Sequence, residues 1–140
     1  MADEAVNVVL LGNKGDPIEM TVAIGTAIAK NTLMQLSATP QVASATSGAG
    51  QFFIGILSEE KTTTDGKTRV AVITHCLADL TCGAGESMVL GEAVMTGAAA
   101  NEVDVAIDNT VEGHREIVGT AQETVAGGGT GTVLINVGKR

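Results

Sequence analysis

The sequence predicts an all-β fold, a small barrel or sandwich of short strands and hairpins with little helix. Three observations support this prediction. Apolar and polar side chains alternate in several segments, for example through Ile18, Met20 and Val22, with the period of two that puts neighbours on opposite faces of a strand. These segments are rich in Val and Ile, whose branched side chains suit a pleated surface. Clusters of turn-forming residues separate them, and the chain contains 18 Gly.

The 140 residues leave room for one domain, or for two very small ones fused, and the 44% that are hydrophobic are enough for a core. We expect an N-terminal arm or first strand over residues 1–16 and a single barrel-like domain over residues 17–140. Strands are predicted at 5–11, 18–24, 52–57, 68–74, 103–107 and 132–137. Asp65-Gly66 indicates a hairpin, because both residues adopt positive φ at low cost. The best helical segment, 25–36, is a weak one because Gly, Asn and Thr interrupt it.

The sequence also contains an apparent two-fold internal repeat, with half-repeats at about 18–76 and 77–138. Residues 51–60 (QFFIGILSEE) align without a gap with residues 115–124 (REIVGTAQET), 64 positions later, so that Gly55 matches Gly119. At the same spacing residues 68–70 match 132–134, and with a small change of spacing residues 30–34 resemble 91–95 more weakly. Two interpretations stay open at this point: two similar halves that share a core, or coincidence between hairpins of similar composition.

Composition and charge disfavour several classes of partner. Eight Lys and Arg against sixteen Asp and Glu leave a net charge of −8, which repels a phosphate backbone, and the only aromatic residues are two Phe. Direct binding of nucleic acid is therefore not expected. No apolar run approaches the roughly 20 residues that span a bilayer, and the N-terminus is acidic, unlike a signal peptide. We expect no membrane segment and synthesis in a cytoplasm.

Two glycine-containing motifs imitate phosphate-binding loops without their spacing. Gly66-Lys67-Thr68 resembles the end of a P-loop, yet the Gly required five residues earlier is Lys61. The run at 127–131 (GGGTG) lacks both the GxGxxG spacing and a following helix. We therefore predict hairpin turns at both places and no cofactor.

The remaining candidates for chemistry are Cys, His and acidic residues. His75, Cys76, Cys82 and His114 could bind zinc or supply a Cys–His pair, but no CxxC or HxxxH spacing supports either. Neighbouring carboxylates on a strand point to opposite faces and do not converge. The acidic residues considered for acid–base catalysis or calcium are Asp3, Glu4, Glu59, Glu60, Glu92, Glu102, Asp104, Asp108 and Glu112. We predict no catalytic residue and no metal site.

A succession of loosely patterned segments covers most of the chain. They are ADEAVNVVL (2–10), residues 17–25 with IAKNTLMQLS (28–37), FFIGILSEEKTTTDGKTRVAVI (52–73), AGESMVLGEAVM (84–95) and EIVGTAQETVAGGGTGTVLINVG (116–138). Their order resembles that of the capsid cement proteins, also called head decoration proteins, of tailed phages and related viruses. Each segment is a pattern of Gly and aliphatic residues, so the specificity of the resemblance lies in their order.

The resemblance implies a structural, non-enzymatic virion protein on the outer surface of the mature capsid. It would stabilise contacts between major capsid proteins and associate with itself, usually as a homotrimer, so that several contacts reinforce one another. The predicted capsid interface is the N-terminal segment Ala5, Val6, Asn7, Val8, Val9 and Leu10. Such an apolar segment can add a strand to the edge of a partner's sheet, or it is simply the first strand of the barrel.

Two other functions stay open on the sequence. One is another structural part of a virion, a tail-tube or connector subunit, which would form rings or stacked tubes. The other is a small metal-binding β-barrel enzyme that uses Cys76, Cys82 and His114.

Overall fold

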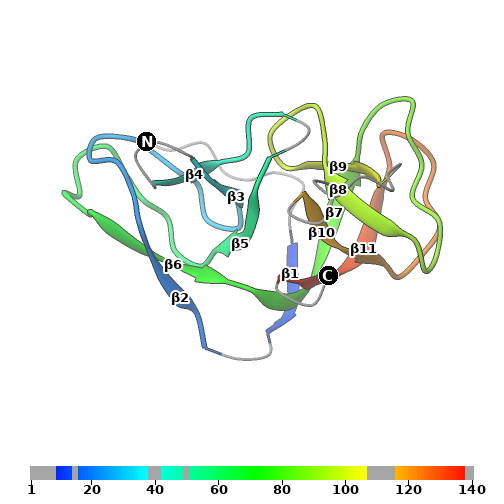
Figure 1. Cartoon of the computed structure of the whole chain (residues 1–140), viewed down its shortest axis with the longest axis horizontal. Helices are drawn as coiled ribbons and strands as arrows, with labels where there is room; N and C mark the ends of the chain where they lie inside the picture. Colours follow the sequence, from blue (N-terminus) through cyan, green and yellow to red (C-terminus); the bar gives the residue numbers. More distant parts are fainter. Residues whose placement is uncertain (1–8, 14–15, 38–41, 49–50, 107–115, 138–140) are drawn as a thin grey trace.

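The chain folds entirely into β-structure over the residues that the computed structural model describes, which are 9–13, 16–37, 42–48, 51–106 and 116–137. These ranges contain eleven strands in two sheets, shown in Figure 1, and confirm the predicted fold class. None of the described residues is helical, and none therefore forms a helix that could cross a membrane. The weak helix expected at 25–36 is wrong, because turns and a short strand occupy this segment.

The first sheet has the strand order β2-β6-β5-β3-β4. Its two outer strands meet at one parallel bridge between Val22 and Ala43, so the sheet curls into a barrel that a single bridge closes. We call residues 18–73 barrel 1. Its strands are β2 (Ile18–Thr21), β3 (Leu33–Leu36), β4 (Ala43–Ala45), β5 (Phe53–Leu57) and β6 (Arg69–Ile73).

The second sheet contains the ring β7-β11-β10-β8-β9. Parallel pairing of β9 with β7 closes this ring, with Thr81 opposite Glu102 and Cys82 opposite Val103. We call residues 75–136 barrel 2. Strand β1 (Val9–Asn13) adds to β7 at the outer end of the sheet. The strands of the ring are β7 (His75–Cys82), β8 (Ala93–Thr96), β9 (Glu102–Val105), β10 (Ile117–Ala121) and β11 (Thr130–Asn136).

The two barrels repeat one connectivity. The bridge between Val22 and Ala43 in barrel 1 corresponds to the pairing of Cys82 with Val103 in barrel 2, 60 positions later. The antiparallel ladders agree as well, since Met34 lies opposite Ala45 and Val94 lies opposite Val105. The predicted two-fold repeat is therefore present in the fold, with β2 to β6 matching β7 to β11 in order.

The spacing of 64 residues holds for the central strand of each repeat. Gly55 lies opposite Met34 and Gly119 lies opposite Val94, and each ladder skips the residue that precedes the glycine, Ile54 or Val118. A Cβ atom on Gly55 or Gly119 would collide with the carbonyl oxygen of the neighbouring strand. The same bulge and the same glycine therefore occur in both barrels, because the backbones approach too closely for a side chain.

The structure corrects the predicted repeat at two places. Leu57 pairs with Val72 in barrel 1 and Ala121 pairs with Val133 in barrel 2, so β6 and β11 are 61 positions apart. The expected match of residues 68–70 with 132–134 is wrong by three positions, because the loop before β11 is three residues shorter. The expected match of 30–34 with 91–95 is wrong by one position, because the positive-φ turn residue Asn31 corresponds to Gly91.

Alternation along the strands of barrel 1 separates two cores. One set of side chains fills barrel 1 itself: Val22, Ile28, Met34, Ala43, Ile54, Leu57, Val70 and Val72. The intervening residues Leu33, Phe53, Ile56 and Ile73 belong instead to the core cluster of barrel 2. Because β3, β5 and β6 are buried on both faces, FIGIL at 53–57 is a continuous apolar run with every residue buried.

Two polar contacts fix the junction between the barrels. The backbone N–H of Leu33 donates to Oδ1 of Asn101 at 2.8 Å, and the backbone N–H of Gln51 donates to Oγ1 of Thr96 at 3.3 Å. Both acceptors lie at the β8–β9 end of barrel 2, while both donors lie in barrel 1. One end of barrel 2 thus covers the outer face of barrel 1.

Candidate interaction surfaces

The N-terminal segment predicted to contact a partner lies partly outside the described residues. This applies to Ala5, Val6, Asn7 and Val8. Val9 and Leu10 begin β1 and pair with Asp79 and Ala78 of β7. Within the described ranges no strand pairs with the other edge of β1, so that edge is open to strand addition. A bulge at Leu11 interrupts the ladder and limits unspecific pairing along this edge.

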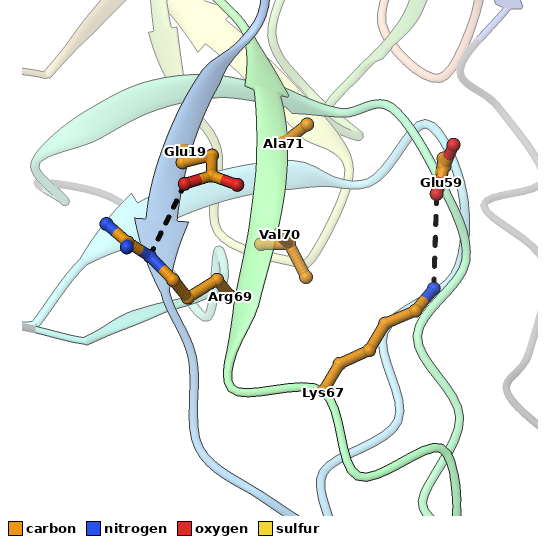
Figure 2. A pocket seen from close by; sticks show the side chains of 6 residues that line it. All are labelled: Glu19, Glu59, Lys67, Arg69, Val70 and Ala71. Atoms are coloured by element: carbon orange, nitrogen blue, oxygen red, sulfur yellow. Dashed lines mark ion pairs between the residues drawn. The ribbon is translucent and has the colours of Figure 1, made fainter.

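A shallow hollow of about 190 Å³ lies on the outer face of barrel 1 (Figure 2). Arg69 Nε lies 3.6 Å from Glu19 Oε2, and Lys67 Nζ lies 4.0 Å from Glu59 Oε2. All four side chains are substantially exposed, and their charges balance. Such pairs are solvated and weak, so the hollow offers no buried acid, base or anion site.

The two cysteines point into the interior of barrel 2 from one strand, β7, and both are buried. Burial raises the pKa of the Cys76 thiol to about 11. Burial, and then the nearby carboxylates of Asp104, Glu86 and Glu102, raise the pKa of Cys82. A raised pKa leaves less of the thiolate, the form that acts as a nucleophile or metal ligand, at neutral pH. Both side chains therefore pack as small apolar groups.

Among the described residues, the structure does not bring the soft ligands together. Cys76 and Cys82 are six residues apart along a strand, or about 20 Å at the usual rise. His114 lies outside the described residues. Across the part of the chain that the structure describes, no group of three or more His, Cys, Asp and Glu side chains is arranged to bind a metal.

The turn that imitates a P-loop is built around Asp65. Its carboxylate accepts the backbone N–H of Thr62 at 2.8 Å and that of Lys67 at 2.9 Å. The hydrogen bond from Lys67 lowers the pKa of Asp65 most, and the bond from Thr62 lowers it further. Gly66 has positive φ and Asp65 does not, so only one of the two turn residues needs the left-handed region. Because Asp65 already occupies the N–H of Lys67, the turn cannot offer that group to a phosphate.

The glycine run at 127–131 also uses its N–H groups internally. Gly128 donates to the carbonyl of Cys82 at 3.0 Å, and Gly129 donates to that of Ala126 at 2.9 Å. A Cβ on Gly127 would collide with the carbonyl oxygen of Glu86. These glycines allow the β10–β11 loop to pack closely against the turn that follows β7.

The acidic candidates fall into exposed and clustered groups. Glu59 and Glu92 are exposed, and Asp3, Glu4, Asp108 and Glu112 lie outside the described residues. Asp104 stands near Glu86 and Glu102, and its partial burial, with the charges of both neighbours, raises its pKa. The sequence does not predict this cluster, because Glu86 and Glu102 are far apart in the chain. The two residues come close only where the β7–β8 turn approaches β9.

Charge divides unevenly between the two barrels. Residues 18–73 contain four acidic and four basic residues, whereas residues 75–136 contain nine acidic residues and one basic residue, Arg115. The net charge of −8 of the whole chain is therefore the charge of barrel 2. Two structures of the same topology thus present very different electrostatic surfaces to a partner.

Comparison with known proteins shows that this chain shares its fold with a protein of known structure. No protein-family model and no curated protein matches the chain. Among solved structures, the chain is similar to the N base of the head fibre protein gp8.5 of bacteriophage phi29, with a TM-score of 0.53 and 15% sequence identity. The similarity covers 85% of this chain and 93% of that chain. At this identity the two chains share an architecture, and function does not follow from architecture alone.

Proposed function

We propose that this chain is a structural protein of a virion, carried on the virus head. The observation that supports the proposal most is the shared fold, since a chain similar over 93% of its length is described as the base of a head fibre. The chemistry of the described candidate residues agrees with a structural role. The thiols are buried with raised pKa values, and the glycine-rich loops satisfy their own N–H groups.

In this proposal the protein binds the outer surface of the mature capsid and contacts major capsid proteins. Residues 17–140 act as one unit, and residues 1–16 act as an arm whose segment 5–10 makes the contact. The open edge of β1, where Val9 and Leu10 lie, supports this assignment, because a partner strand can pair there through backbone hydrogen bonds.

The proposed mechanism is mechanical, with no reaction and no cofactor. A homotrimer would engage equivalent sites on several capsid proteins, and the second and third contacts would form at high effective concentration. Neighbouring capsid proteins could then separate only after the trimer had been released. The negative charge of barrel 2 would keep a coated particle dispersed and would not attract free nucleic acid.

Co-sedimentation with mature heads that lack this protein tests the proposal. The full chain is expected to bind saturably, and native mass spectrometry is expected to show a trimer. Removing residues 1–8 leaves β1 whole and is expected to weaken head binding at least tenfold while the protein stays folded. Glu59→Gln, an exposed change in the hollow of barrel 1, is the matched control and should bind as the wild type does.

Three outcomes would contradict parts of the proposal. A full chain that does not bind heads would contradict the role on the head. Rings or stacked tubes of the purified protein would favour a tail-tube or connector subunit. A truncated protein that binds as tightly as the full chain would remove residues 1–8 from the interface.

A further inference from the structure

Two loops come together at one end of barrel 2. The β7–β8 turn (residues 83–92) and the β10–β11 loop (residues 122–129) lie side by side at the edge away from barrel 1 (Figure 1). A bridge between Met88 and Val125 joins them, and the backbone N–H of Leu90 donates to Oγ1 of Thr124 at 3.1 Å. We call these two loops the tip of barrel 2.

The tip exposes two consecutive aliphatic side chains. Val89 is 41% exposed and Leu90 is 65% exposed. The repeat shows what the same turn contains elsewhere, because the bridge of Met88 to Val125 corresponds to that of Ile28 to Lys61. The counterparts of Val89 and Leu90 are therefore Ala29, which is buried, and Lys30, which is exposed. The fold requires no large apolar residue at these positions, so stability of the turn does not explain Val89 and Leu90.

Backbone hydrogen bonds hold the turn in one conformation. Gly91 donates to the carbonyl of Ala121 at 2.9 Å, and Glu92 donates to that of Val89 at 3.0 Å. Gly91 supplies the positive φ that the turn needs. A partner that binds Leu90 therefore orders little backbone, which lowers the entropic cost of association.

The charge around the tip has one sign. Glu86 and Glu92 belong to the turn and Glu123 belongs to the neighbouring loop, while barrel 2 has no basic residue outside Arg115. The corresponding loops of barrel 1 contain Lys30, Lys61 and Lys67 with their acidic residues. The carboxylates of Glu86, Glu92 and Glu123, which we call the rim, together with the exposed aliphatic side chains of the same two loops are complementary to a basic protein surface with an apolar socket. It repels nucleic acid and anionic lipid.

We propose that the tip of barrel 2 is a docking surface for a protein partner, with Leu90 as the apolar anchor and the surrounding carboxylates as a steering rim. The partner presents an apolar socket within a positively charged surface. This inference rests on the proposed function, in which the partner is the shell protein of the head, and it adds a second contact to that of the N-terminal arm.

The test uses the full chain and purified mature heads that lack it. The double substitution Val89→Ala with Leu90→Lys gives the tip the residues that barrel 1 has in the same turn. Head binding is expected to weaken at least tenfold, as for an exposed anchor residue. The control is Ile24→Lys, because Ile24 is 68% exposed in the matching region of barrel 1, and it should bind within about twofold of the wild type. Both variants should melt near the wild-type temperature.

A salt series separates the two parts of the interface. Binding of the wild type is expected to weaken as salt rises from about 50 to 200 mM, because the rim acts through screened charges. The inference would be overturned if the tip variant bound heads as tightly as the wild type does. It would also be overturned if wild-type binding did not depend on salt. In both cases the proposed role on the head would stand. No binding by the wild type would overturn the proposed function and this inference with it.

Discussion

Barrel 1 and barrel 2 share one strand order and one glycine-marked bulge but differ in almost everything that a partner would detect. Barrel 1 is closed by a single bridge, buries part of its outer face, and has no net charge. Barrel 2 is closed by a paired strand and carries a charge of −8. The comparison shows that this topology tolerates large changes in surface charge and burial. The feature that both barrels keep is the close approach of neighbouring backbones at Gly55 and Gly119.

The interiors differ at one position that the topology treats as equivalent. Lys61 is fully buried in barrel 1, where its ammonium donates to the carbonyl of Thr26 at 3.0 Å and lies 3.6 Å from Asp65. Its counterpart in barrel 2 is Val125. The fold therefore accepts at this position either an apolar side chain or a charge that has its own acceptors.

The largest effect is expected where the barrels are most alike. Gly55→Ala and Gly119→Ala should each lower the free energy of unfolding by about 3 kcal/mol or more, because the added methyl group meets a neighbouring backbone carbonyl. Gly55→Ala should be the worse of the two, since Gly55 also has a φ of 132°. Urea denaturation measures both.

Gly12→Ala is the control for these substitutions. No atom lies within 4 Å of a Cβ built on Gly12, so its unfolding free energy should change by no more than about 0.5 kcal/mol. Wild-type stability in either central-strand variant would show that the bulge is not a shared requirement of the two barrels.

A smaller loss of stability is expected at Lys61, where the interiors of the two barrels differ. Lys61→Ala should cost about 2–3 kcal/mol, because it opens a cavity and leaves the carbonyl of Thr26 without its donor. Lys61→Met should cost about 1–2 kcal/mol less than Lys61→Ala, because both substitutions remove the donor to Thr26 but the Met side chain fills the space. Thermal and urea unfolding would compare the two. Equal losses would mean that the charge, rather than the volume, stabilises barrel 1.

The smallest effect is expected in the acidic cluster of barrel 2. Burial, with Glu86 and Glu102, raises the pKa of Asp104, so the folded state holds this proton more tightly than the unfolded state does. Stability from this group is present below pH 3.8 and is lost as pH rises through the folded pKa. Asp104→Asn should therefore stabilise the protein at neutral pH, by about 0.5 kcal/mol for a partly exposed group. Unfolding measured from pH 3 to 7 should show a gain that grows with pH; a gain independent of pH would contradict the assignment.

Local patterns in the sequence predicted much of the fold but missed strands that depend on remote partners. Alternation indicated β2, β9 and β11, and apolar runs indicated β5 and β6. Strand β7, the longest, was not predicted, because its buried face consists of Cys, Ala and Leu rather than the branched residues typical of strands. The turn and strand at 25–36 looked weakly helical because the pairing of Leu33 and Met34 with β5 decides their conformation.

The candidate sites show the same division. The sequence was enough to predict turns rather than phosphate loops at Gly66 and at 127–131, because the residue spacing was wrong for anion binding. It could not identify the tip of barrel 2, because Val89 and Leu90 in an apolar-rich segment have the composition of a core. Only the tertiary structure shows that these two side chains are exposed and lie outside the core.

By itself the sequence determined that this protein is all-β, since period-two alternation is local, and the matched glycines at 55 and 119 suggested a repeat that only the strand pairings established. Tertiary structure alone decided the register of β6 against β11, the burial of the outer face of barrel 1 by barrel 2, and the meeting of Glu86, Glu102 and Asp104. The physical reason is that pairing and burial depend on which distant segments come together, and loop lengths that differ by a few residues shift that outcome without changing any local pattern.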